Sequence, residues 1–210
     1  MAAHVLAFVL TAWIVSKVRR SLTDFHDRTG QDPLTDALSK EAFDVALQQA
    51  IVAAKENTSL LLFVLADLDD LAHINHRFGR RHGDRVLIAF AQQARRSMGR
   101  AALIARTSGD RFAFLVTIES CATGERFAVG LQTSLSFVLT KGTGLVTCSM
   151  GGVLIAPYDR RSIVSLMDRA DRLMASAKCS GKNAVELEWN DFHRMHSAAR
   201  QSSDAPRLTR

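Results

Sequence analysis

The stretch that most constrains the fold of this 210-residue chain is an apolar run that ends in acidic residues. Residues 60–66 are all apolar, which is typical of a strand buried on both faces of a sheet. Asp67, Asp69 and Asp70 follow directly. Residues two apart in a strand point to one side, and the end of a buried strand is open to ligands. The pattern predicts that Asp67 and Asp69 hold a divalent cation, and the alternative is that these acids cap the next helix.

An amide and a further carboxylate follow in two predicted helices. We expect a short helix that carries Asn75 and ends at Gly79, and a long helix that begins at Gly83 and Asp84 and ends at Met98. This arrangement returns Asn75 and Asp84 toward the end of the strand. A carboxylate accepts from N1–H and N2–H of guanine, and an amide both donates and accepts, so the pair matches the Watson–Crick edge of guanine.

The other elements are predicted from apolar spacing and from turn residues. We expect helices over residues 34–57, 120–139 and 162–178, and strands over 101–105, 112–118, 145–155 and 184–189, the first two strands forming a hairpin. Thr35 or Ser39 is expected to cap the first of these helices.

Composition limits the classes of partner. The net charge of +6 is modest and is interpreted as spread along the chain, which suits phosphate ligands or an anionic membrane surface. With one Tyr and two Trp, the chain has few aromatic side chains for base stacking, and no nucleic-acid partner is expected. The three cysteines have no metal-site spacing, which indicates reduced, buried thiols in a cytosolic domain.

The ends of the chain differ from its centre. Residues 1–20 are expected to be a membrane anchor, in which residues 1–16, apolar from Ala2 to Val15 apart from His4 and Thr11, precede a basic flank of Lys17, Arg19 and Arg20. The alternatives are a hydrophobic helix that pairs with a copy of itself, or a start inside a longer gene. Residues 21–31 are expected to be a linker, 32–189 the folded domain, and 190–210 a disordered tail.

Five motifs in order resemble the GGDEF family of diguanylate cyclases. They are Asp32, Leu34 and Thr35 (D-x-L-T); Asp67, Asp69, Asn75, Gly79, Gly83 and Asp84; the hairpin signature Ser108-Gly109-Asp110-Arg111-Phe112; Ser149-Met150-Gly151-Gly152-Val153; and Ala170, Asp171, Ala177, Lys178, Gly181, Lys182 and Asn183. The resemblance covers residues 32–189.

The resemblance implies a fold, a reaction and site residues. The fold would be α+β, of the nucleotidyl-cyclase type related to the polymerase palm, with a central, mainly antiparallel sheet surrounded by helices. Two domains, each loaded with Mg²⁺ and GTP, would face each other as a homodimer and make cyclic di-GMP. Asp67 and Asp110 would be the metal and catalytic residues. Asn75 and Asp84 would bind guanine, and Lys178 and Lys182 the triphosphate.

Several positions depart from the family pattern. Arg111 replaces the glutamate of the signature and puts a positive charge beside the expected cation, and Ser108 replaces the first glycine. In the second motif, Leu71-Ala72 replaces Phe-Lys, His76 replaces Asp, and Arg80 replaces His. The R-x-x-D motif of product inhibition would fall on Gly99 and Ala102 and is absent.

Three hypotheses remain open from the sequence. The chain is an active diguanylate cyclase, a GTP-binding regulatory module whose activity is weak or lost because of Arg111, or a structural dimerisation module that binds no nucleotide. The expected location is the inner membrane with the domain in the cytoplasm, and the alternative is the cytoplasm alone.

Overall fold

The computed structural model describes residues 30–143 and 145–188. Its elements are α2 (Lys40–Glu56), β1 (Leu60–Leu68), α3 (Leu71–Phe78), α4 (Arg80–Met98), β2 (Leu103–Ser108), β3 (Arg111–Ile118), α5 (Cys121–Thr143), β4 (Cys148–Ile155), α6 (Ile163–Cys179) and β5 (Val185–Glu188). The predicted anchor, most of the linker and the predicted tail lie outside the described residues. Within the described part of the chain, no helix is long and apolar enough to cross a bilayer.

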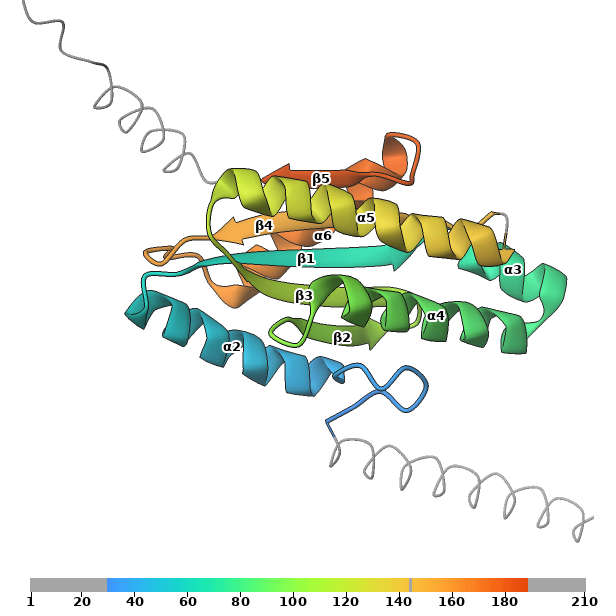
Figure 1. Cartoon of the computed structure of the whole chain (residues 1–210), viewed down its shortest axis with the longest axis horizontal. Coiled ribbons are helices and arrows are strands. Elements are labelled where there is room, and N and C mark those ends of the chain that lie inside the picture. Colours follow the sequence, from blue (N-terminus) through green and yellow to red (C-terminus); the bar gives the residue numbers. More distant parts are fainter. Residues whose placement is uncertain (1–29, 144, 189–210) are drawn as a thin grey trace, which may run out of the picture.

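A five-stranded sheet forms the centre of the domain, in the order β2-β3-β1-β4-β5 (Figure 1). The pairs β2–β3, β3–β1 and β1–β4 are antiparallel, and β4–β5 is parallel. The prediction of a mainly antiparallel sheet in an α+β fold is therefore confirmed. Because β1 is the central strand, the acids at its end lie between β3 and β4.

Helices cover both faces of the sheet, with α4 and α5 on one face and α2 and α6 on the other (Figure 1). Alternate residues of β1 enter two cores. Leu62 and Val64 lie in the core under α4 and α5, whereas Leu61 and Phe63 lie in the core under α2 and α6. The predicted strand buried on both faces is confirmed, because the pleat sends successive side chains to opposite faces.

The first helix begins later than predicted. α2 starts at Lys40, and Ser39 caps it by accepting from the Ala42 N–H. Asp32 accepts hydrogen bonds from both the backbone and the hydroxyl of Thr35. These bonds hold a turn in which Asp36 has a φ of 55°, so the helical spacing before Ser39 does not become helix.

Several other bounds also differ from the predictions; for example, β4 begins at Cys148 and not at residue 145. α4 begins at Arg80, three residues before the predicted start. β2 extends through Arg106 and Thr107 to Ser108, so the hairpin connection shrinks to Gly109-Asp110. The Arg106 side chain is only 15% exposed there, and its hydrogen bonds to Asp32 and to the Gly109 carbonyl allow this polar residue to continue the edge strand.

Close packing between β4 and α6 depends on Gly151. A Cβ at this position would lie 2.2 Å from the Ala170 carbonyl oxygen and 2.2 Å from the Met174 amide nitrogen. The backbone of α6 therefore rests directly on β4, and this contact fixes the position of the last turn of α6 near the end of β1.

Candidate functional site

The side chain of Asp67, the last but one residue of β1, lies between two cationic side chains. The Lys178 ammonium donates to Asp67 Oδ1 at 2.6 Å, and Arg111 Nε donates to Asp67 Oδ2 at 3.4 Å. Arg111 is directly opposite Asp67 in the β1–β3 ladder. Only 6% of the Asp67 side chain is exposed, so its charge is balanced mainly by these two partners.

Arg111 also contacts a second acid. Its Nη1 atom lies 2.9 Å from Asp171 Oδ1 on α6, as an ion pair that lacks hydrogen-bond alignment. The guanidinium therefore bridges an acid of the sheet and an acid of the helix. Asp171 and Lys178 lie two turns apart on α6, a spacing that places them on one face of the helix.

Opposing influences act on the Asp67 carboxyl. Burial raises its pKa, the hydrogen bond from Lys178 lowers it, and the negative charge of Asp110 raises it again. The net effect is a pKa above the usual value. Asp110 lies at the same end of the sheet, where its carbonyl accepts from the Leu68 N–H at 3.2 Å.

Asp69 has a different set of partners from Asp67, and that the two hold one cation stays a prediction. Asp69 Oδ1 accepts from the Ser149 hydroxyl at 2.8 Å. Its Oδ2 accepts from the Thr147 hydroxyl at 2.7 Å and from the Asn183 N–H at 3.1 Å. Asp69 thus joins β1 to the start of β4 and to the loop after α6.

Asn75 and Asp84 lie on the facing helices α3 and α4. Asn75 Oδ1 is buried and has no hydrogen-bond partner among the described residues. A Cβ on Gly83 would lie 1.9 Å from this oxygen, so the glycine makes room for the amide. An acceptor without a partner is the group that a ligand N–H would satisfy. Asp84, half-buried one residue after Gly83, is close along the chain to this position.

Lys178 and Lys182 both reach acids at the end of β1. Lys182 lies beyond the end of α6 with a φ of 65°, so the predicted helical spacing does not apply to it. Its ammonium nevertheless donates to both oxygens of Asp70, at 2.7 and 2.8 Å. The hydrogen bond with Asp70 raises the pKa of Lys182. Both ammonium groups lie where a phosphate chain could exchange for a carboxylate.

The donors at this strand end do not fit a magnesium ion. Mg²⁺ takes oxygen ligands, usually one or two carboxylates together with substrate phosphates and water. Within residues 30–143 and 145–188, no three Asp, Glu, His or Cys side chains form a site that could hold the ion without a nucleotide. The Asp67 oxygens instead face the nitrogens of Lys178 and Arg111.

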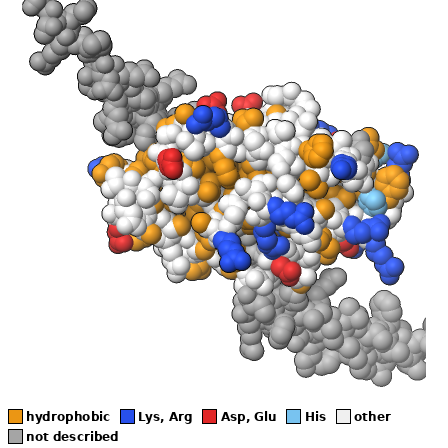
Figure 2. Space-filling model, in the orientation of Figure 1, with side chains coloured by type: hydrophobic (Ala, Val, Ile, Leu, Met, Phe, Trp, Pro, Cys, Tyr) orange, Lys and Arg blue, Asp and Glu red, His pale blue; other side chains and the backbone are white. Residues whose placement is uncertain are grey.

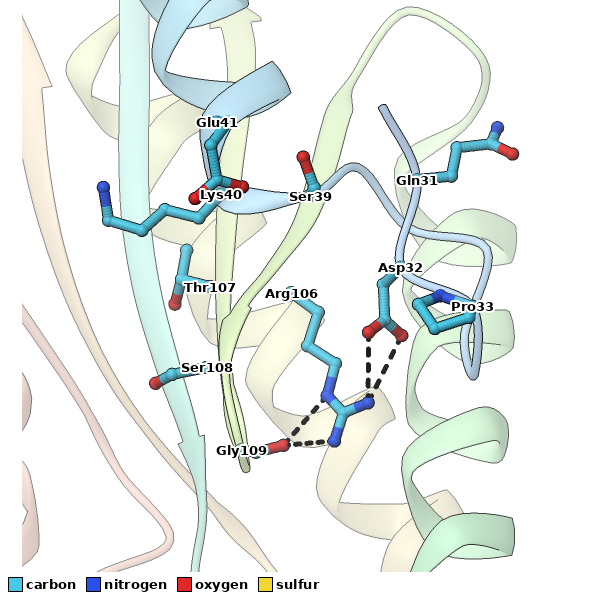
Figure 3. A pocket seen from close by; sticks show the side chains of 10 residues that line it. All are labelled: Gln31, Asp32, Pro33, Ser39, Lys40, Glu41, Arg106, Thr107, Ser108 and Gly109. Carbon is cyan, nitrogen blue, oxygen red and sulfur yellow. Dashed lines mark hydrogen bonds and ion pairs between the residues drawn. The ribbon is translucent and has the colours of Figure 1, made fainter. Parts of the chain in front are cut away.

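A hollow of about 360 Å³ lies beside the hairpin turn (Figure 3). Arg106 crosses it, donating to Asp32 at 3.3 Å and to the Gly109 carbonyl at 2.6 and 2.9 Å. The side chains of Asp67 and of the two lysines do not line it. Arg106 links the D-x-L-T turn to the hairpin and holds the signature loop in place.

The family model described as "Diguanylate cyclase, GGDEF domain" matches residues 29–184. The chain belongs to the GGDEF family. The diguanylate cyclases DgcP and TpbB of Pseudomonas aeruginosa are 28% and 30% identical over 79% and 76% of this chain. The chain spans only 25% and 38% of their respective lengths. The GGDEF domain of DgcB from Caulobacter crescentus, solved with c-di-GMP, is 25% identical with a TM-score of 0.67, covering 75% of this chain and 95% of that one.

The structure explains how the unusual residues of the GGDEF signature are accommodated. Ser108 is not among the residues with positive φ, so a serine fits where the family has its first glycine. The sequence motifs included Asp171 only as part of the closing motif and did not predict its ion pair with Arg111. The helical spacing of Asp171 and Lys178 was the available signal, since two turns place both on the face toward the site.

Proposed function

We propose that this GGDEF domain binds GTP and acts as a regulatory module in cyclic di-GMP signalling, with weak or no cyclase activity. The observation that carries the proposal is the position of Arg111, whose guanidinium faces Asp67 where the family has a carboxylate. The relatives named as diguanylate cyclases support the substrate class. Because this chain spans only 25% and 38% of those relatives, an activity of the whole protein is a proposal.

The nucleotide would be held by this chain's own side chains. Asn75 offers its unpartnered amide oxygen, and Asp84 a carboxylate, to the N–H groups of guanine. Lys178 and Lys182 would exchange Asp67 and Asp70 for phosphate oxygens. Arg111 is also suited to this task, because a guanidinium binds phosphate through two parallel hydrogen bonds.

The family reaction also requires that Asp67 and Asp110 align magnesium for attack by a 3′-hydroxyl. When bound, the metal would supply charge stabilisation to the reacting phosphate. Because Arg111 and Lys178 contact Asp67 instead, the chain is proposed to bind GTP without this alignment. A homodimer and a cytoplasmic domain at the inner membrane belong to the same proposal, the latter supported by the sequence of residues 1–20 alone.

A structural dimerisation module is the second candidate. It is favoured by the complete pairing of Asp69 and by the pairing of Asp70 with Lys182, since these acids need no ligand to be satisfied. Such a module would bind no nucleotide.

Thermal unfolding of the full chain with GTP, in chelator and in Mg²⁺, separates these functions, with ATP as the control nucleotide. Saturation at about 100 times Kd stabilises by about 2.7 kcal/mol, which corresponds to roughly 5–10 °C for a domain of this size. A shift with GTP in chelator, and not with ATP, supports the proposal. A shift that requires Mg²⁺, with cyclic di-GMP formed overnight, indicates an active cyclase, and no shift indicates the structural module.

A further inference from the structure

The positive charge of this chain is concentrated on α3 and α4. The chain has 27 Lys and Arg against 21 Asp and Glu. α3 and α4 together hold six arginines and one aspartate, a net charge of +5, so the rest of the chain holds 21 basic and 20 acidic residues. The interpretation that the excess charge is spread along the chain is therefore wrong.

Most of these arginines are free to meet a partner. Arg77, Arg80, Arg81, Arg85 and Arg96 are exposed, and none forms an ion pair with another described residue. Arg95 is not included, because it donates a hydrogen bond to a backbone carbonyl of the turn before α2. We call the exposed set of Arg77, Arg80, Arg81, Arg85 and Arg96 the arginine ridge.

Three members of the arginine ridge lie nearly in line along α4. Arg81, Arg85 and Arg96 lie within about 60° of one another around α4 and span about 22 Å along it. Figure 2 shows basic side chains along the lower part and the right-hand end of the visible face, where α4 and α3 lie. A ridge of this length matches a surface of many negative charges better than a single small anion.

One exposed aromatic side chain stands at the tip of the ridge. Phe78 is 50% exposed and precedes Gly79, where the chain turns from α3 into α4. His82 lies 5.3 Å from its ring centroid, and Arg77 lies 5.1 Å from it. The ring is thus already in contact with two side chains. An apolar ring flanked by arginines suits the boundary between lipid headgroups and acyl chains.

We infer that the arginine ridge and Phe78 dock this domain on an anionic phospholipid surface. The apolar residues 1–16 and the basic flank that follows them favour a membrane over a nucleic acid, because that sequence is expected to place the domain beside a bilayer. The inference does not depend on nucleotide binding. It rests on the charge and exposure of α3 and α4 and on the sequence of residues 1–20.

The test is co-sedimentation of the full chain with two kinds of vesicle, phosphatidylcholine alone and equal parts of phosphatidylcholine and phosphatidylglycerol. Residues 1–16 are expected to contribute to binding to both kinds of vesicle. The ratio of the two partition constants therefore reports the contribution of charge to binding. Removing two arginines near such a surface weakens binding roughly thirtyfold. For the variant Arg81→Glu/Arg85→Glu, the ratio of the partition constant on anionic vesicles to that on phosphatidylcholine vesicles is therefore expected to fall at least tenfold. If this variant unfolds, Arg81→Gln/Arg85→Gln replaces it.

The matched control is Lys55→Glu/Arg126→Glu, which makes the same change in net charge at exposed positions on α2 and α5. It is expected to keep the preference. Equal binding of the parent chain to both vesicles would overturn the inference, as would an equal loss in the control. A ridge variant that keeps the vesicle preference but loses binding to a single-stranded RNA would point to nucleic acid instead.

Discussion

Replacement of Arg111 is expected to change the magnesium affinity of the site in graded steps. At an effective dielectric of about 20 and a separation of about 5 Å, one unit of charge acts on a divalent ion with roughly 6 kcal/mol before screening. The Arg111 side chain is 45% exposed, and we discount this energy to roughly 2 kcal/mol for water and salt. Arg111→Gln removes one charge, and Arg111→Glu changes two. The expected gains in Mg²⁺ affinity are therefore about thirtyfold and about a thousandfold.

Calorimetric titration of the nucleotide-free full chain with Mg²⁺ measures these gains. Arg126→Glu, an exposed change on α5, is the control and should leave the affinity unchanged. Incubation of each variant with GTP then tests for cyclic di-GMP, which is expected from Arg111→Glu alone. The reasoning is refuted if neither Arg111 variant binds Mg²⁺ more tightly than the parent, or if the α5 variant gains as much.

Three further predictions concern stability and reactivity. Gly151→Ala should destabilise the fold by about 3 kcal/mol in denaturant unfolding, because its Cβ would overlap backbone atoms of α6, whereas Gly130→Ala on α5 meets open space and should stabilise slightly. Burial raises the pKa of the Cys148 thiol to about 12, so a thiol reagent at mildly alkaline pH should label exposed Cys179 in the native protein and Cys148 only after unfolding. Because the pKa of Asp67 is raised in the folded state, its contribution to stability is lost as pH rises through that value, and the melting temperature of Asp67→Asn relative to the parent should rise from about pH 4 to about pH 7.

The sequence predicted the elements better than their ends. The apolar run of β1 and the helical spacing of α6 depend on which side chains face the two cores, and these patterns are visible in the chain itself. The start of α2 depends instead on competition between the helix and the hydrogen bonds of Asp32 with Thr35, which helical spacing does not record. The edge position of β2, which admits Arg106 and Thr107 into a strand, is likewise a property of the whole sheet.

In the candidate site, too, some features were predicted from the sequence and others depend on residues far apart in the chain. Asp67, Asp110 and Lys178 were predicted as site residues, and the structure brings all three to one sheet end. The hydrogen-bond partners of Asp69 could not be predicted from its spacing of two residues from Asp67. Its partners include Thr147, far along the sequence, and only the β1–β4 register brings them together.

Asp67 is better explained by ligand binding than by folding. A raised pKa means that the charged carboxylate is less favourable in the folded protein than in the unfolded chain, so at neutral pH this group reduces stability. Lys178 and Arg111 are each more than a third exposed on their side chains and could be hydrated without it. The fold therefore does not require the acid. A carboxylate that opposes folding and also holds two cations near the end of the sheet is typical of a functional site, where a phosphate chain can replace it as their partner.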